Sequence, residues 1–146
     1  MQEQKIYISN RGNLGGKDPD EENKPDYLER ALETGVCVKT DVWVIKDKTV
    51  TGTDHPSIGI NLNVFDKEKL LIQARNPTAL LLLLKEGYHC FWRESDNLIM
   101  TNRNFVLSYA GSIFPKSIIM LPEENAIITN GDYMGICSDF ISGWVE

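Results

Sequence analysis

The stretch from residue 25 to residue 44, PDYLERALETGVCVKTDVWV, carries the clearest structural signal in the chain. Pro25 is typical of the first turn of a helix, where its missing N–H would have no partner in any case. Gly35 is typical of the residue just after a helix. The residues from Val36 to Val44 are rich in valine and predict a strand. The apolar positions of the helix share one face: Tyr27, Leu28, Ala31 and Leu32.

A further strand is predicted before this stretch, and a strand followed by a helix is predicted after it. Residues 5–9 predict a strand, followed by a loop over residues 10–23 that is rich in Gly, Asn and Asp. Residues 70–74 predict a third strand, and Asn76-Pro77 starts a second helix that stops at Gly87. Five successive leucines, 80–84, predict that this helix packs on more than one side. Strands that alternate with helices predict a parallel sheet with right-handed crossovers.

The second half of the chain shows short predicted strands and no further clear helix. Short β-type runs occur at residues 88–93, 97–101, 105–109, 117–121 and 135–141, with turns between them. A full (β/α)₈ barrel usually needs about 250 residues, and this single predicted domain, 1–146, has only two clear helices. We therefore expect an α/β fold, namely a reduced, closed TIM-like barrel that lacks several outer helices. An open α/β sheet is the alternative.

Composition narrows the class of protein. The 15 basic and 21 acidic residues give a net charge of −6, which disfavours binding to long nucleic acids but leaves room for a small basic pocket. The longest apolar run, residues 79–84, is far shorter than the ~20 residues that span a bilayer, and the N-terminus does not resemble a signal peptide. Three widely spaced cysteines without a Cys-x-x-Cys pair predict reduced thiols rather than a zinc site. We expect a cytoplasmic protein with no membrane partner.

A series of short motifs runs through the chain in a fixed order. They are ISNRGN (8–13), ENKPDYLERAL (22–32), KTDVW (39–43), GTDHP (52–56), IQARN (72–76), FWRESD (91–96), SIIMLPE (117–123) and GICSDF (135–140). From about residue 5 to about residue 141, the chain resembles the compact members of the glycerophosphodiester phosphodiesterase and phosphatidylinositol phospholipase C-like superfamily. The resemblance implies a reduced TIM barrel and an ancestral activity that cuts phosphodiesters.

The chain departs from this superfamily at both catalytic histidines. The usual His-Arg-Gly motif corresponds to Asn10, Arg11 and Gly12, and the usual Gly-His-Asp motif corresponds to Gly52-Thr53-Asp54. Neither Asn10 nor Thr53 titrates near neutral pH, so neither replaces a general acid or base. His55 lies two residues beyond the lost histidine, and only an irregular loop would bring it to the same place. We therefore predict no catalytic residue.

The implied metal site is also altered. Glu22 and Asp41 match two of the carboxylates that hold a divalent cation in the superfamily, but the third position is Lys39. Because a nearby ammonium repels a hard cation, we predict neither a metal nor another cofactor. Lys39 is expected to replace the metal and to bind a ligand phosphate directly. The alternative is that Lys39 only neutralises two buried carboxylates.

Further substitutions add positive charge. Gln73 stands at another lost histidine, Arg75 replaces a lysine, and Arg93 replaces a fourth histidine. Arginine suits bidentate contact with phosphate, although each cation taken singly can also be a salt-bridge partner. Trp43 and Trp92 are pocket walls or core residues, and Glu123 and Asp139 are pocket acids or structural partners. The predicted ligand-binding residues are Asn10, Arg11, Glu22, Lys39, Asp41, Trp43, Thr53, Asp54, Gln73, Arg75, Trp92 and Arg93.

The substitutions favour a binding protein over an enzyme. The leading interpretation is a pseudoenzyme that captures a phosphorylated small molecule, such as a nucleotide or a cyclic nucleotide. Sequestration of a signalling nucleotide, as in viral counter-defence proteins, is one form of this function. The alternatives are an active phosphodiesterase on glycerophosphodiester-like or nucleotide substrates and a protein-interaction scaffold. The apolar segment 141–145 is expected to dock on a second subunit, which would give a homo-oligomer, or on its own barrel.

Overall fold

The computed structural model describes residues 4–109, 112, 114–125 and 132–145. Among these residues, ten strands form one mixed sheet. Seven of the strands are parallel and lie in the order β6-β5-β2-β1-β10-β9-β8. Their bounds are β1 (Ile6–Asn10), β2 (Cys37–Ile45), β5 (Leu70–Ala74), β6 (Cys90–Phe91), β8 (Val106–Ser108), β9 (Ile118–Met120) and β10 (Gly135–Ser138).

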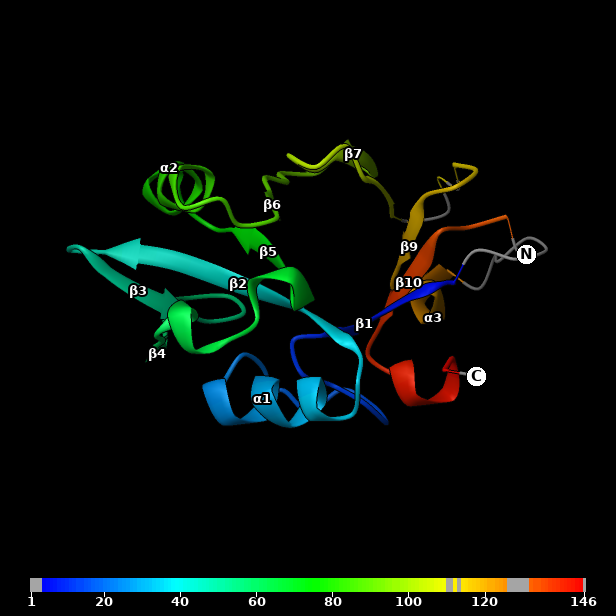
Figure 1. The fold of residues 1–146 in the computed structure, drawn as a ribbon, viewed down its shortest axis with the longest axis horizontal. Helices are drawn as coiled ribbons and strands as arrows, with labels where there is room; N and C mark the ends of the chain where they lie inside the picture. The colour runs from blue at the N-terminus through cyan, green and yellow to red at the C-terminus, as the bar shows by residue number, and fades with distance from the viewer. Residues whose placement is uncertain (1–3, 110–111, 113, 126–131, 146) are drawn as a thin grey trace.

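The parallel strands follow chain order around a curled sheet. From β1 the sheet continues through β2, β5 and β6 in one direction and through β10, β9 and β8 in the other, and Figure 1 shows the two arms bending toward each other. Within the described residues β6 and β8 share no ladder. The chain passes between them through β7 (Leu98–Met100), which pairs antiparallel with β8. The fold is thus a mixed α/β half-barrel with few helices, and its backbone hydrogen bonds leave one seam open between β6 and β8.

A hairpin extends the middle of the sheet. β2 runs beyond the end of β1 and pairs from Val42 to Ile45 with β3 (Lys48–Thr51), which in turn pairs with β4 (Ile58–Gly59). Lys46 and Asp47 both have positive φ, as two-residue hairpin turns with the twist of the sheet require. The hairpin projects at the left of Figure 1.

Two helices cover neighbouring outer surfaces of the sheet. α1 (Pro25–Glu33) begins at Pro25 and is followed by Gly35 at φ 100°, as predicted, and its Leu28 packs with Val38 of β2 and Ile136 of β10. α2 (Pro77–Lys85) is capped by Asn76, whose side chain accepts a hydrogen bond from the N–H of Ala79. A third helix, α3 (Pro122–Asn125), is one short turn next to β10.

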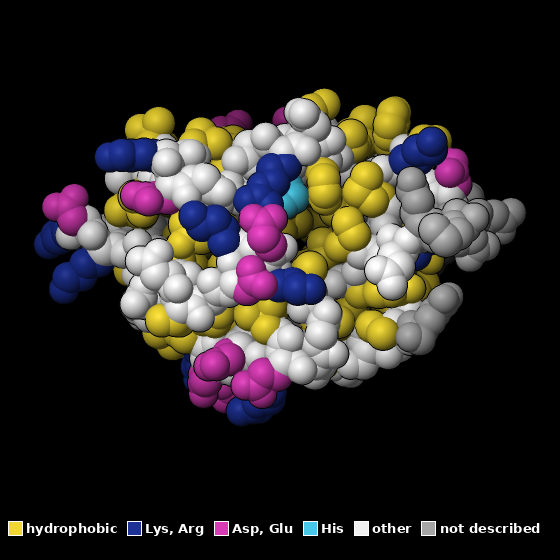
Figure 2. Space-filling view, viewed as in Figure 1, with side chains coloured by type: hydrophobic (Ala, Val, Ile, Leu, Met, Phe, Trp, Pro, Cys, Tyr) yellow, Lys and Arg dark blue, Asp and Glu magenta, His cyan; other side chains and the backbone are white. Residues whose placement is uncertain are grey.

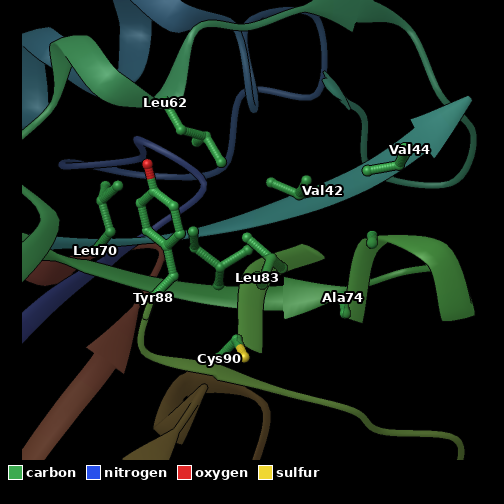
Figure 3. Packing of buried hydrophobic residues seen from close by; sticks show 10 residues of the cluster. Val42, Val44, Leu62, Leu70, Ala74, Leu83, Tyr88 and Cys90 are labelled. Atoms are coloured by element: carbon green, nitrogen blue, oxygen red, sulfur yellow. The ribbon is translucent and has the colours of Figure 1, made fainter. Parts of the chain in front are cut away.

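The prediction that the leucine-rich helix packs on more than one side is wrong. Leu83 of α2 is fully buried against the sheet, where Figure 3 shows it among Val42, Leu70 and Tyr88. Leu81 on the outer side is 69% exposed. The described chain supplies no second layer over α2. In the described parts of the chain, no helix has the length and apolar character needed to cross a bilayer.

Side chains fill the inside of the curl. The interior cluster consists of Ile8, Leu71, Phe91, Leu107, Tyr109, Ile118, Met120 and Cys137, which come from β1, β5, β6, β9, β10 and the β8 region. Phe91 and Leu107 lie on opposite sides of the seam, so apolar packing joins the two arms, together with a backbone hydrogen bond from Asn102 N–H to the oxygen of Cys90 at 3.2 Å. The C-terminal Ile141 is buried in the cluster beneath α1, so this segment docks on its own fold.

Candidate site at the strand ends

The predicted ligand-binding residues gather where the parallel strands end. Asn10 is the last residue of β1, Gln73 lies near the end of β5, and Asp41 lies opposite Gln73 in the ladder between β2 and β5. Because side chains alternate along a strand, Lys39 and Asp41 share the inner face of β2 while Val38 and Val42 face the helices. The inner face at the carboxyl ends therefore carries the polar residues, and the apolar interior cluster lies below them.

Two adjoining pockets open at this edge of the sheet. The mouth pocket has a volume of about 250 Å³. The loop pocket, of about 430 Å³, lies between the loop after β1 and the segment between β3 and β4. Seven predicted residues line the mouth pocket: Asn10, Arg11, Lys39, Asp54, Gln73, Arg75 and Arg93. Four line the loop pocket: Arg11, Glu22, Thr53 and Asp54.

Asp41 organises the floor of the mouth pocket. Its Oδ2 accepts hydrogen bonds from Arg11 Nε at 2.8 Å and Asn23 Nδ2 at 3.0 Å, and its Oδ1 accepts them from Lys39 Nζ at 2.9 Å and Arg75 at 3.1 Å. We call these five residues the Asp41 cluster. Asp41 has no exposed surface. Three cations thus surround one buried carboxylate, and Glu22 is a second acid 3.6 Å from Arg11.

The charges of the cluster depend on one another. Burial alone would raise the pKa of the Asp41 carboxyl, but the Lys39 ammonium and the Arg11 guanidinium more than offset burial and hold that pKa well below its usual range. Burial lowers the pKa of Lys39, and the attraction of Asp41 offsets only part of this effect. Lys39 is 3% exposed. Lys39 therefore neutralises the buried carboxylate of Asp41, as the alternative interpretation expected.

Asn10 and Thr53, where the resemblance would place two histidines, are held by hydrogen bonds to acids. Asn10 Nδ2 donates to Asp139 Oδ1 at 2.8 Å, and Thr53 Oγ1 donates to Glu22 Oε1 at 3.3 Å. Asn13 joins the two acids, because its Nδ2 donates to Glu22 and to Asp139 at 2.8 Å each. Asn10 and Thr53 thus serve as hydrogen-bonding groups in a fixed network, and neither side chain changes its protonation state near neutral pH.

The donor set does not fit the divalent cation that the family resemblance implies. Both oxygens of Asp41 already accept hydrogen bonds from cationic or amide groups, and the Lys39 ammonium lies 2.9 Å from one of them. A hard cation needs several free oxygen ligands and is repelled by an adjacent ammonium. Among the described residues, no three His, Cys, Asp or Glu side chains are grouped so that they could hold a metal ion.

Aromatic rings hold two of the arginines at the mouth pocket. The Arg75 guanidinium lies 5.2 Å from the ring centre of Trp43, and that of Arg93 lies 3.7 Å from the ring centre of Tyr109. Arg75 also donates to the backbone oxygen of Thr53 at 2.6 Å. Trp43 lines neither pocket; it packs against Arg75, and its Nε1 donates to the backbone oxygen of Gly52 at 2.9 Å. Both guanidiniums are oriented before any ligand arrives.

One predicted residue lies elsewhere. Trp92 follows the inward-facing Phe91, is 37% exposed and lines neither pocket. Sequence reasoning missed Asn13 and Asn23, whose amides connect the acids of the site. Asn23 has φ 68°, donates to Asp41 and accepts from Thr40 and from the N–H of Asp41. An asparagine beside Glu22 in a loop is usually a turn residue, so no signal in the sequence separated this role from a turn.

Comparison with protein-family models, with curated proteins and with solved structures gave no match to this chain.

Proposed function

We propose that this chain is a degenerate member of the phosphodiesterase superfamily that it resembles, and that it binds a phosphorylated small molecule without cutting it. In this proposal the curled sheet is a reduced TIM-like barrel, closed across the seam by the packing of Phe91 and Leu107. The ligand is a nucleotide, a cyclic nucleotide or a related phosphate ester, and its phosphate occupies the mouth pocket. In the cell, we propose that the protein is cytoplasmic and sequesters such a ligand.

The charge of the mouth pocket carries the proposal. Four cations line it, namely Arg11, Lys39, Arg75 and Arg93, against the two exposed carboxylates Asp54 and Glu94. Asp41 lies beneath three of these cations, and Arg11 also lies 3.6 Å from Glu22. Phosphate oxygens are the natural partners of several cations in one concavity, because guanidinium groups bind them in a bidentate manner.

Donors remain available for a ligand. The hydrogen bonds of Arg75 to described residues use only one of its three nitrogens, and the Arg75 side chain is 23% exposed. Gln73 lines the same pocket, and within the described chain its amide has no hydrogen-bond partner. A phosphate in the mouth pocket would thus meet unused N–H groups from Gln73 of β5 and from Arg75, which directly follows this strand.

The rest of the surface supports a small ligand rather than a long nucleic acid. Figure 2 shows Lys and Arg side chains interspersed with Asp and Glu on the face in view, without a continuous basic surface. The chain as a whole carries a net charge of −6. The cations are gathered in one pocket, as expected for recognition of a compact anion.

Capture from a metabolite extract tests the proposal. Purified protein is incubated with a nucleotide and phosphometabolite extract, washed and denatured, and the released compounds are identified by mass spectrometry. We expect an intact phosphorylated compound at about one per chain, reduced at least ~10-fold by Arg75→Gln. Arg103→Gln is the matched control, because Arg103 pairs with Glu68 and lines neither pocket. If nothing is retained, the scaffold interpretation replaces this proposal.

Hydrolysis is the second candidate, and one observation favours it. His55 lies in the segment between β3 and β4, is exposed, and lines the loop pocket together with Arg11 and Glu22. A single imidazole could act as a general acid or base. Turnover of bis(p-nitrophenyl) phosphate that His55→Ala abolishes would establish this function, whereas equal background rates in both proteins would exclude it.

A further inference from the structure

The two pockets at the strand ends differ in charge although they share a wall. The mouth pocket is lined by four cations and two carboxylates. The loop pocket is lined by equal numbers of each sign, with Arg11, Lys17 and Lys24 against Asp20, Glu22 and Asp54. Arg11 and Asp54 belong to both pockets. One compartment therefore favours an anion, and the adjoining compartment favours a polar group without net charge.

Arg11 is fixed at the junction of the pockets. Its N–H donates to the backbone oxygen of Lys39 at 2.7 Å, and its own backbone oxygen accepts from the N–H of Asn23 at 3.0 Å. Its φ of 60° is uncommon for a residue with a side chain, and these two bonds hold it there. The guanidinium donates to Asp41 through Nε and lies 3.6 Å from Glu22 through a second nitrogen. It therefore reaches acids on both sides of the junction.

The outer wall of the loop pocket is also built rigidly. A side chain at Gly52 would place its Cβ 1.8 Å from the backbone oxygen of His55, so the chain folds back on itself at this glycine. The N–H of Ser57 donates to the backbone oxygen of Thr51 at 2.9 Å, and Arg75 holds the backbone oxygen of Thr53. The cation that faces the mouth pocket thus also holds the wall of the loop pocket.

We infer that the mouth and loop pockets form one bipartite site for an organic phosphate monoester whose uncharged part is a sugar or a nucleoside; this inference rests on the proposed function. The phosphate lies in the mouth pocket, and the uncharged, hydroxyl-rich part lies in the loop pocket. Asp54 stands at the junction with an exposed carboxylate that accepts hydrogen bonds from sugar hydroxyls. The volumes agree with this division, since the larger compartment, of about 430 Å³, falls within the range of small-molecule sites.

Four probes of increasing size test the inference by isothermal titration calorimetry: inorganic phosphate, ribose 5-phosphate, adenosine 5′-monophosphate and adenosine without phosphate. We expect inorganic phosphate to bind most weakly of the three phosphates. At least one of the two esters should bind roughly 10-fold or more tightly than phosphate, the effect of one or two additional hydrogen bonds. Adenosine alone should bind more weakly than its monophosphate.

Ser57→Trp fills the loop pocket and is the decisive variant. The affinity of each ester should fall to that of inorganic phosphate measured on the same variant. Ser142→Trp is the matched control, because Ser142 is exposed and lines neither pocket. Circular dichroism shows whether each variant is folded, and Asp54→Asn gives a second test in which only the preference for the esters over phosphate should decline.

The outcomes separate the two proposals. If inorganic phosphate binds and neither ester binds more tightly, the bipartite site is overturned and the phosphate pocket stands. If the esters bind more tightly but Ser57→Trp does not reduce their advantage, the loop pocket is not the second compartment and the inference is again overturned. If no phosphate compound binds, the proposed function itself fails and the inference fails with it.

Discussion

Replacing Asp41 by asparagine removes the single negative charge at the centre of the Asp41 cluster. The substitution keeps the shape of the side chain and one hydrogen-bond acceptor. It leaves the Lys39 ammonium, which is 3% exposed, without the carboxylate that lies 2.9 Å away. Arg11 and Arg75 lose the same partner, but their side chains are 19% and 23% exposed, so water compensates them in part.

The magnitude follows from the burial of Lys39. Removing one partner of a buried ion pair costs about 3–5 kcal/mol. The cost has a ceiling, because Lys39 can release its proton. Deprotonating a lysine of ordinary pKa at pH 7 costs about 4.6 kcal/mol. We therefore expect Asp41→Asn to lower the free energy of unfolding by about 3–5 kcal/mol at pH 7.

The pH dependence gives the sign of the effect independently. In the variant, burial without a partner carboxylate lowers the pKa of Lys39 further, so the unfolded state binds more protons than the folded state between the two pKa values. The stability of the variant must then rise with pH in that range. In the native chain the pKa of Asp41 is depressed, so its contribution is complete above the ordinary aspartate pKa and is lost only as the pH falls through the lower folded value.

Urea unfolding followed by tryptophan fluorescence measures both effects. Asp47→Asn is the control, because Asp47 is exposed in the hairpin turn and its positive φ suits asparagine. The double variant Asp41→Asn with Lys39→Met should lose less stability than the two single variants added together. A loss below about 1 kcal/mol for Asp41→Asn, or a gap from the native protein that does not narrow as the pH rises, would refute the reasoning.

Three further predictions concern other parts of the molecule. Gly52→Ala should open the segment between β3 and β4 and cost about 1–3 kcal/mol, because its Cβ would collide with the backbone of His55; new cleavage between residues 52 and 57 in limited proteolysis measures this, and unchanged resistance contradicts it. Asn10→His combined with Thr53→His should give no hydrolysis of bis(p-nitrophenyl) phosphate, because Lys39 still neutralises Asp41; measurable turnover would be inconsistent with the role of Lys39. Burial, followed by the charge of Arg103, lowers the pKa of His89 to about 4, so NMR should find its ring neutral until about pH 4, and stability should fall as the pH drops from about 6.5 to 4; a normal titration would show that His89 is not buried.

The regular elements of the first half of the chain were predictable because local signals and packing agree there. Pro25 and Gly35 bound α1, and Asn76 caps α2, as the sequence indicated. The short strands of the second half also appeared near their predicted places, although each is shorter than its apolar run. The antiparallel direction of β7 was not predicted, because the direction of a three-residue strand depends on its neighbours and not on its own sequence.

The sequence predicted which residues belong to the site better than it predicted which of them contact one another. The motifs that resemble those of the superfamily predicted Arg11, Lys39, Asp41 and Arg75 at strand ends, and the structure brings all four together. That three cations would share one carboxylate could not be read from the sequence, because contacts between strands depend on register and side-chain rotamers. For Trp92 the alternation of β6 decides the outcome, since Phe91 takes the inner face and Trp92 the outer one.

The antiparallel strand β7 marks the part of the fold where insertions and deletions should be tolerated best. The connection between β6 and β8 covers residues 92–105, and the regular element described within it is the three-residue strand β7 rather than a crossover helix. The segments on either side of β7 are therefore the places where an insertion would add a helix without disturbing the Asp41 cluster, which is built from β2, the loop after β1 and the residue that follows β5. Diversity in chain length among proteins of this architecture should accumulate at the seam, while the strand ends that hold the charges keep their spacing.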